Sequence, residues 1–306
     1  MSLSASIHIA SPSNPRVKQT VKLRQRSERD RLGLALIEGF RELRHAVRQR
    51  HSLHTLFFCP DLFLGENEAA LIEQAVRQGA QTASCTEKVF RKLSYRDRPD
   101  GLLAVAAKAG SSLAEVRIGK DALVVVAESI EKPGNLGAIL RSADAVGAAA
   151  ALVCDPATDI NNPNVGRASI GTLFCLPVVE TSSAEALAWL RRHRFFIVAA
   201  SPHAEQIYTR TALPARTAIV VGSEQYGLGK TWTDQADALV RIPMRGQADS
   251  LNVASATTLL LYEALRQHSG AQGMAAGIGR LLPEQAPGQK ARAGTRTQKI
   301  HPTPGT

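Results

Sequence analysis

The sequence predicts an α/β protein with two domains, in which a small α/β domain precedes a larger one built on a parallel sheet. Three observations support this prediction. The chain has 306 residues, and at about 150 residues per domain this length favours two domains. Short apolar runs alternate with helical patterns along most of the chain. In the second half these runs are continuous in Val, Ile, Leu and Ala, which is typical of strands buried on both faces of a parallel sheet.

Composition and charge narrow the possible classes of protein. Hydrophobic residues make up 44% of the chain and charged residues 21%, which is enough apolar material for ordinary cores. No apolar run approaches the roughly 20 residues of a membrane-spanning helix, and the N-terminus lacks a secretory pattern, so we expect a cytoplasmic protein without a membrane partner. The net charge of +10 favours a polyanionic partner, most commonly a nucleic acid. The cysteines show no metal-ligand spacing, so we expect free thiols and no metal site: Cys59, Cys85, Cys154 and Cys175.

The first 110 residues predict an arm and a small domain. Residues 1–26 open the chain as a basic N-terminal arm, and VKLRQRSERDR fits either an arm that contacts phosphates or an ordinary solvated helix. Residues 27–110 predict a small α/β domain. Its helical stretches lie at 40–50, 66–78 and 86–94, and its apolar runs at 53–59, 82–85 and 101–107.

Residues 111–120 are weakly patterned and predict a linker, and residues 121–268 predict the second domain. The apolar runs of that domain lie at 122–129, 149–155, 172–180, 194–201, 217–224 and 238–244, with helical stretches that include 131–148, 183–193 and 250–269. From residue 269 to residue 306 Gly, Pro, Gln, Lys and Arg dominate and large apolar residues are almost absent, which predicts a disordered basic tail.

Three segments of the second domain contain candidate residues of a functional site. The first, EKPGNLGAILRSADAVGA, follows a buried strand and predicts a helix with Asn135 at its N-cap and Gly147 just after its end. Taken alone, Asn135 is explained by capping, and Arg141 by a surface ion pair with Asp144. The second, VVGSEQYGLGK, is a glycine-rich loop in which Glu224 could simply bond the amides of its own loop.

The third segment is IPMRGQADSLNVASATTLLLYEAL. Ser250 is placed to cap the helix that follows. Asn252 stands between Leu251 and Val253 in an otherwise apolar first turn, so it needs a hydrogen-bonding partner if it is buried. The glycine loop of the second segment matches neither a dinucleotide fingerprint nor a phosphate-binding loop, which makes a nucleotide site a weak interpretation.

In this order, the three segments resemble the three motifs of the SpoU/TrmH branch of the SPOUT RNA methyltransferases, over about residues 120–268. The preceding module resembles the substrate-binding domain that many of these enzymes carry. The resemblance implies a catalytic domain with a parallel sheet and a deep trefoil knot, which only the resemblance justifies because knots are rare. It further implies S-adenosylmethionine as cofactor, a homodimer with a shared active site, and a ribosomal-protein-like RNA-binding domain in front.

The resemblance also assigns individual residues. The family's catalytic positions fall on Asn135, Arg141, Glu224, Ser250 and Asn252. The cofactor is expected against Gly222, Ile242 and Leu251, with Ser223 and Met244 lining the pocket, and RNA is expected to contact Arg141 and Arg167. Tyr226 stands in the glycine loop where smaller residues are frequent, which leaves the shape of that loop open.

The implied reaction is transfer of a methyl group to a ribose 2′-hydroxyl without a metal. Arginine ordinarily stays protonated, so Arg141 either loses a proton transiently or orients the target phosphate, which then accepts the hydroxyl proton. The expected substrate is rRNA of the 23S type, with tRNA as the other possibility. Two further alternatives are a non-catalytic RNA-binding or ribosome-assembly adaptor and a SPOUT enzyme that methylates a base.

Overall fold

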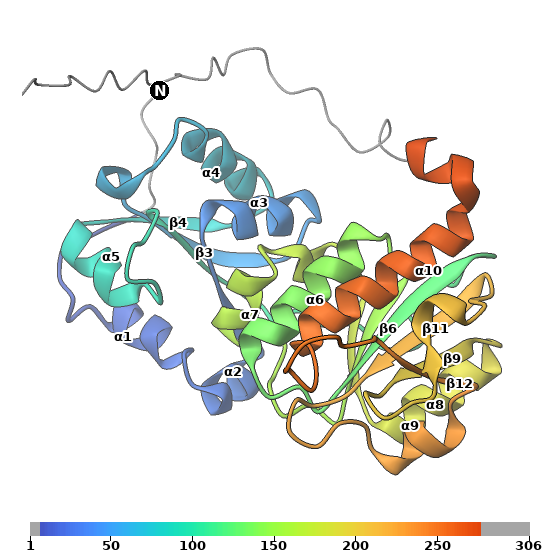
Figure 1. The fold of residues 1–306 in the computed structure, drawn as a ribbon. Helices are drawn as coiled ribbons and strands as arrows, with labels where there is room; N and C mark the ends of the chain where they lie inside the picture. Colours follow the sequence, from blue (N-terminus) through green and yellow to red (C-terminus); the bar gives the residue numbers. More distant parts are fainter. Residues whose placement is uncertain (1–6, 277–306) are drawn as a thin grey trace, which may run out of the picture. The chain divides into compact units, whose positions relative to one another are not determined.

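The computed structural model describes residues 7–276, with side chains through residue 269. Within residues 7–268 the chain builds two separate sheets, one of five strands and one of seven (Figure 1). Helices flank both sheets, so the expected α/β architecture with a parallel sheet is confirmed.

The five-stranded sheet has the order β1-β4-β3-β5-β2 and is mixed, because β5 pairs antiparallel with both β2 and β3. One face packs against α3 and α4, and the other packs against α1 and α5. The bounds are β1 Ile7–Ile9, α1 Pro15–Lys22, α2 Arg26–Leu32, β2 Leu34–Glu38, α3 Phe40–Arg48, β3 Leu53–Phe58, α4 Glu68–Arg77, β4 Gln81–Cys85, α5 Glu87–Leu93 and β5 Leu102–Ala107.

The expectation of a separate arm over residues 1–26 is wrong for the part that the structure describes. Strand β1 pairs with β4, and Val17 and Leu23 are buried in the core between α1, α5 and the sheet. The sequence pattern was misleading because only a few apolar residues, spaced far apart, anchor this segment among many charged ones.

The seven-stranded sheet is entirely parallel, in the order β10-β12-β9-β11-β6-β7-β8. All six apolar runs expected there contain a strand, although the run at 172–180 is divided between a short 3-10 turn, η2 (Thr172–Phe174), and β8. The bounds are β6 Ala122–Glu128, β7 Ala150–Cys154, β8 Val178–Thr181, β9 Phe196–Ala200, β10 Gln206–Ile207, β11 Arg216–Val221 and β12 Ala238–Arg241.

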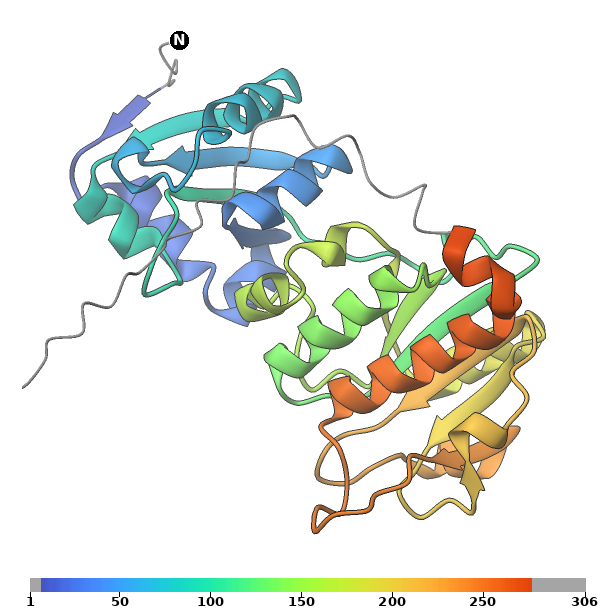
Figure 2. The ribbon, with the colours of Figure 1, turned by 45° about the horizontal axis from the view of Figure 1, so that its top comes forward.

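Helices cover both faces of this sheet, which explains why its strands are apolar throughout. Leu123 and Val125 of β6 lie in one core with α6 (Pro133–Ala145) and α10 (Val253–Ala276), whereas Val124 lies in the other core with α8 (Ser183–Arg192) and Trp232 of α9 (Lys230–Gln235). Figures 1 and 2 both show α6 and α10 side by side on one face. The hydroxyls of Ser142 and Thr258 join these two helices at 2.7 Å.

The strand order reverses at the centre of this sheet. From β6 the chain moves outward through β7 and β8, then crosses to β9 and returns to place β11 between β9 and β6. In open α/β sheets, ligands bind outside the carboxyl ends of the strands at such a reversal. This topology therefore predicts a ligand site among the loops that follow β6, β9, β11 and β12.

The helix α7 (Pro163–Ala168) packs directly against α6 at Gly137. A Cβ atom at Gly137 would lie 2.5 Å from the Cβ of Ala168 and 2.7 Å from the carbonyl oxygen of Val165. We expect Gly137→Ala to lower the free energy of unfolding by about 1–3 kcal/mol, because the two helices must separate. Urea denaturation measures this, with Gly134→Ala in the same helix as the control because its Cβ meets nothing within 4 Å. Equal stability of the two variants would contradict the prediction.

The expected tail at residues 269–306 is partly wrong, because α10 continues as far as Ala276. The remainder of that predicted tail, residues 277–306, lies outside the described residues.

Candidate active site

A cavity of about 530 Å³ lies at the carboxyl ends of β9, β11 and β12. The loops after these strands and the first turn of α10 form its wall. All five residues expected to contact the cofactor line this cavity: Gly222, Ser223, Ile242, Met244 and Leu251. Two of the expected catalytic residues, Glu224 and Ser250, also line it. The structure thus brings together residues from two segments that are separated by β12 and α9 in the sequence.

The loop after β11 has a tightly fixed backbone. Ser223 is buried, and its hydroxyl accepts a hydrogen bond from the backbone N–H of Tyr226 at 3.0 Å. The backbone N–H of Gly227 donates to the carbonyl of Ser223 at 3.0 Å, which closes the loop on itself. A Cβ atom at Gly222 would overlap the carbonyl of Gly227, so only glycine allows this close approach. Tyr226 is 78% exposed at the tip, so its size is accommodated without disturbing the loop.

Glu128 anchors this loop and was missed in the sequence. It is the last residue of β6 and is 7% exposed. Its carboxylate accepts from the backbone N–H of Gly229 at 2.7 Å and from the hydroxyl of Ser183 at 2.9 Å, while Trp232 donates to that hydroxyl at 3.1 Å. The sequence does contain a signal for Glu128, because it is an acidic residue that ends an otherwise apolar run. A buried carboxylate of this kind needs several donors, and here it finds them.

Three expected catalytic residues form a polar chain beside the cavity. The side-chain amide of Asn135 donates to the carboxylate of Glu224, and the amide of Asn252 donates to the side-chain oxygen of Asn135 at 3.1 Å. Glu224 and Asn252 are exposed and Asn135 is half-buried, and the three residues come from three different segments, namely α6, the loop after β11 and the start of α10. We name this set the Asn135 cluster (Asn135, Glu224 and Asn252). It offers a ligand both amide donors and carboxylate acceptors.

Several local roles differ from the expectations. Asn135 is not the N-cap of its helix, because α6 begins at Pro133 with Lys132 as N-cap, which leaves the Asn135 side chain free for the cluster. Ser250 does not cap α10, because Asn252 does: its side-chain oxygen accepts from the backbone N–H of Ala254 at 3.0 Å. The bonds from Asn252 to Asn135 and Ala254 supply the partners that its position required.

The described contacts do not support the purely structural roles considered for Glu224 and Arg141, namely bonding of loop amides by Glu224 and an ion pair between Arg141 and Asp144. Ser223, rather than the Glu224 carboxylate, accepts the side-chain-to-backbone bond within the loop. Arg141 forms no ion pair with Asp144 among the described side chains. Asp144 instead faces His45 of α3, and burial raises the pKa of the Asp144 carboxyl while the His45 charge opposes that rise.

Arg141 and Arg167 stand apart from the Asn135 cluster. Both side chains are exposed, and neither has a hydrogen bond or ion pair with any residue that the structure describes. Arg141 lies six positions after Asn135 on the same helix, which corresponds to about 9 Å along the axis. Each guanidinium is therefore free to bind an anion from outside the chain.

Neither a metal centre nor a membrane span is found in residues 7–276. Within this range no group of three or more His, Cys, Asp and Glu side chains could hold a metal ion. No helix of the described part is long and apolar enough to cross a membrane. The four cysteines are free, as expected; Cys175 is half-buried and the other three are buried.

Two families match consecutive parts of this chain. The MRM3-like substrate binding domain matches residues 14–104, and the SpoU rRNA Methylase family matches residues 122–262. The chain is 31% identical over 251 residues to the 23S rRNA (uridine(2479)-2′-O)-methyltransferase of Streptomyces viridochromogenes, which covers 80% of this chain and 87% of that protein. It is 26% identical over 254 residues to the 23S rRNA (guanosine(2553)-2′-O)-methyltransferase RlmP of Bacillus subtilis, covering 83% and 97% of the two chains.

Solved structures of RNA methyltransferases also resemble this chain. A crystal structure of an RNA 2′-O ribose methyltransferase superposes with a TM-score of 0.74 at 42% identity, covering 85% of this chain and 98% of that chain. The AdoMet-bound rRNA methyltransferase from Sinorhizobium meliloti superposes with a TM-score of 0.77 at 28% identity, with the same coverage of 85% and 98%.

Proposed function

Because this chain belongs to the SpoU rRNA methylase family, we propose that it transfers a methyl group from S-adenosylmethionine to a ribose 2′-hydroxyl of RNA. The substrate class is ribosomal RNA of the 23S type, on which the relatives named above act. The observation that carries the proposal is the Asn135 cluster, which joins three separate segments at the edge of one cavity.

The cavity fits the cofactor in size and chemistry. Its volume of about 530 Å³ falls in the usual range of small-molecule sites, about 300–1,000 Å³. Its wall combines polar residues such as Ser223 and Glu224 with apolar residues such as Ile242, Met244 and Leu251. Such a wall suits a ligand that carries an adenine ring, a ribose and an amino-acid part. When bound, S-adenosylmethionine supplies a methyl group activated as a sulfonium.

The chain's own residues then have to place the ribose and promote loss of its hydroxyl proton. The amides of Asn135 and Asn252 can bind the ribose, and Glu224 fixes the orientation of Asn135. The free guanidinium of Arg141 binds the target phosphate, which accepts the 2′-hydroxyl proton while the positive charge stabilises the developing alkoxide. We assign Arg141 this role because a guanidinium stays protonated and is a poor general base.

We also propose that the chain acts as a homodimer with a shared active site. Arg141 has no polar contact with the Asn135 cluster within one chain, so a second copy can complete the site. In addition α10 leaves Leu259 and Tyr262 exposed, at 41% and 43%. Light scattering should give twice the chain mass at micromolar concentration. A monomer there would rule out the shared site.

The experiment that tests the proposal is transfer of a labelled methyl group to separated rRNA and tRNA pools, followed by alkaline hydrolysis. A 2′-O-methyl group blocks cleavage, so an alkali-resistant labelled dinucleotide from the rRNA pool is expected. The same product from tRNA alone would overturn the substrate class. Label only in mononucleotides would show base methylation, and absence of both label and cofactor binding would favour a non-catalytic adaptor.

RNA capture is expected to depend on three arginines of α3. Arg41 and Arg48 are exposed and Arg44 is half-buried between them, and none forms an ion pair with the described acidic side chains. Burial, together with the charges of Arg48 and Arg41, lowers the pKa of the Arg44 guanidinium, as expected for like charges that lack a counter-charge. Phosphates of bound RNA can supply that counter-charge.

We therefore expect Arg41→Gln, Arg44→Gln and Arg48→Gln each to weaken RNA binding and to make it less sensitive to salt. Each lost phosphate contact should lower the slope of log affinity against log salt concentration by about 1. Filter binding to total rRNA at several salt concentrations measures the slope. Arg192→Gln on α8 is the control with the same change in net charge. An equal loss in the control would mean that overall charge, and no particular surface, governs binding.

The RNA assignment extends to Arg167 of α7, whose exposed guanidinium is free to bind phosphate. We place the reaction in the cytoplasm, since rRNA is the substrate class and since Arg167 and Arg141 need access to a large RNA.

A further inference from the structure

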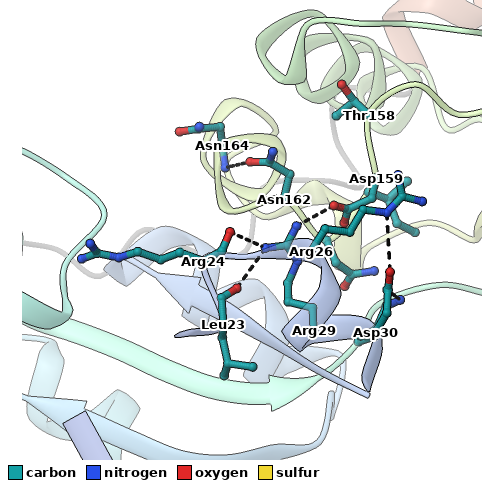
Figure 3. A network of polar contacts seen from close by, with 12 residues as sticks. Leu23, Arg24, Arg26, Arg29, Asp30, Thr158, Asp159, Asn162 and Asn164 are labelled. Atoms are coloured by element: carbon teal, nitrogen blue, oxygen red, sulfur yellow. Dashed lines mark hydrogen bonds and ion pairs between the residues drawn. The ribbon is translucent and has the colours of Figure 1, made fainter. Parts of the chain in front are cut away.

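Arg29 of α2 is a buried arginine that joins this helix to the segment between β7 and α7 (Figure 3). Its guanidinium forms an ion pair with the carboxylate of Asp159 at 2.5 Å, and the two side chains are only 3% and 8% exposed. The same guanidinium donates to the backbone carbonyls of Leu23 and Arg24 at 2.9 and 2.8 Å. Arg29 is thereby fixed within the substrate-binding domain while it holds a residue of the catalytic domain.

Asp159 belongs to a segment between β7 and α7 that is held at further points. The hydroxyl of the adjacent Thr158 donates to the backbone carbonyl of Glu131. Two positions further on, the side chain of Asn161 exchanges two hydrogen bonds with the backbone of Ala109, at 2.7 and 2.9 Å. Both Thr158 and Asn161 are buried. These bonds connect both α2 and the end of the first domain at Ala109 to the catalytic domain through a few neighbouring residues.

The contact with Glu131 leads directly to the candidate active site. Glu131 immediately precedes Lys132, the N-cap of α6, and Asn135 lies in the first turn of that helix. The contacts therefore run from Arg29 to Asp159, from Thr158 to Glu131, and along the chain to Asn135, whose side chain bonds Glu224 and Asn252. Neither the cavity nor the Asn135 cluster includes Arg29 or Asp159.

We propose that Arg29 and Asp159 are positioning residues, which couple the placement of the substrate-binding domain to the geometry of the Asn135 cluster. This inference rests on the proposed methyltransferase function. A buried charge without its partner is very unfavourable, so the pair permits one docking arrangement of the two domains and disfavours any other. RNA held on the first domain then meets Asn135 at a fixed spacing.

Variants of the pair can separate positioning from stability. Arg29→Met or Asp159→Leu alone leaves one buried charge unpaired, so each should lower the melting temperature. The double variant Arg29→Met/Asp159→Leu removes both charges and should regain much of that stability. If the pair positions the site, the double variant still methylates total rRNA at least about tenfold more slowly, because misplacement by about 1 Å can cost 10²-fold.

Two further measurements make the assignment specific. Thr158→Val keeps the shape of the side chain but removes its bond to Glu131, so it should slow methylation with no loss of RNA affinity. Affinity for S-adenosylmethionine, measured by calorimetry, should stay within about twofold in all these variants. This change is smaller than the tenfold change that corresponds to about 1.4 kcal/mol. Glu28→Leu/Arg31→Met replaces a partly exposed ion pair on the same helix and serves as the control.

The outcomes are distinguishable. A stable double variant whose methylation rate equals that of the wild type would overturn the inference, since the pair would then contribute only to folding. Slow methylation together with equally weakened cofactor binding would also overturn it. Failure of the wild type itself to methylate any RNA would instead refute the proposed function.

Discussion

Replacement of Arg141 by alanine should slow methyl transfer by roughly 10²–10³-fold, the usual effect of removing one group that stabilises charge in a transition state. Arg141 is exposed on α6 and forms no polar contact within the described chain, so its removal leaves no buried partner unsatisfied. The loss should therefore appear in the rate constant. Affinity for S-adenosylmethionine should change little, because Arg141 does not line the cavity.

Single-turnover methylation of rRNA and calorimetry of cofactor binding together measure these two effects. Arg192→Ala on α8, another exposed arginine without an ion pair, is the matched control. If turnover and cofactor affinity fell in parallel for Arg141→Ala, Arg141 would be a structural residue and the assignment of phosphate binding would be wrong.

The second large effect is expected from Gly222→Ala, which should weaken binding of S-adenosylmethionine. The added methyl group would overlap the carbonyl of Gly227, so the loop after β11 has to move away from the cavity that it lines. Overpacking of this kind typically costs about 1–3 kcal/mol. When this free-energy cost applies to the cofactor-bound conformation of the loop, the affinity for S-adenosylmethionine drops by about tenfold to a hundredfold.

Calorimetry again measures the affinity, and thermal unfolding shows whether the fold is retained. Gly166→Ala in α7 is a suitable control, because a Cβ there meets nothing within 4 Å and the position lies outside the cavity. Unchanged cofactor affinity in a folded Gly222→Ala protein would show that this loop does not form the cofactor site.

Most of the catalytic domain could be predicted because its strands are covered on both faces. Each continuous apolar run predicts a buried strand, and each run contains a strand in the structure. The strand β10 (Gln206–Ile207) could not be found, because two residues, one of them polar, carry no pattern. Arg29 was equally hidden. A charged residue on a charged helix indicates a solvated face, and only tertiary structure supplies its buried partner Asp159.

The candidate site was predictable by segment and less so by contact. The three motifs placed Asn135, Glu224 and Asn252 after buried strands, but only the strand order brings these ends together. The sequence predicts the wrong N-cap residue for both α6 and α10, because an asparagine or serine near a helix start is a good cap whether or not it is used. Lys132 and Asn252 occupy those positions in the structure.

The central place of β11 also affects how the chain folds. Ala122 of β6 pairs with Arg216 of β11, so the middle of the sheet stays open until β11 has been synthesised after β7, β8, β9 and β10. Pairings between segments so distant in sequence form slowly, and the loops that line the cavity come from this late part of the chain. A nascent chain therefore completes its first domain well before this cavity. Ligand that binds only the finished site then stabilises the whole fold by mass action.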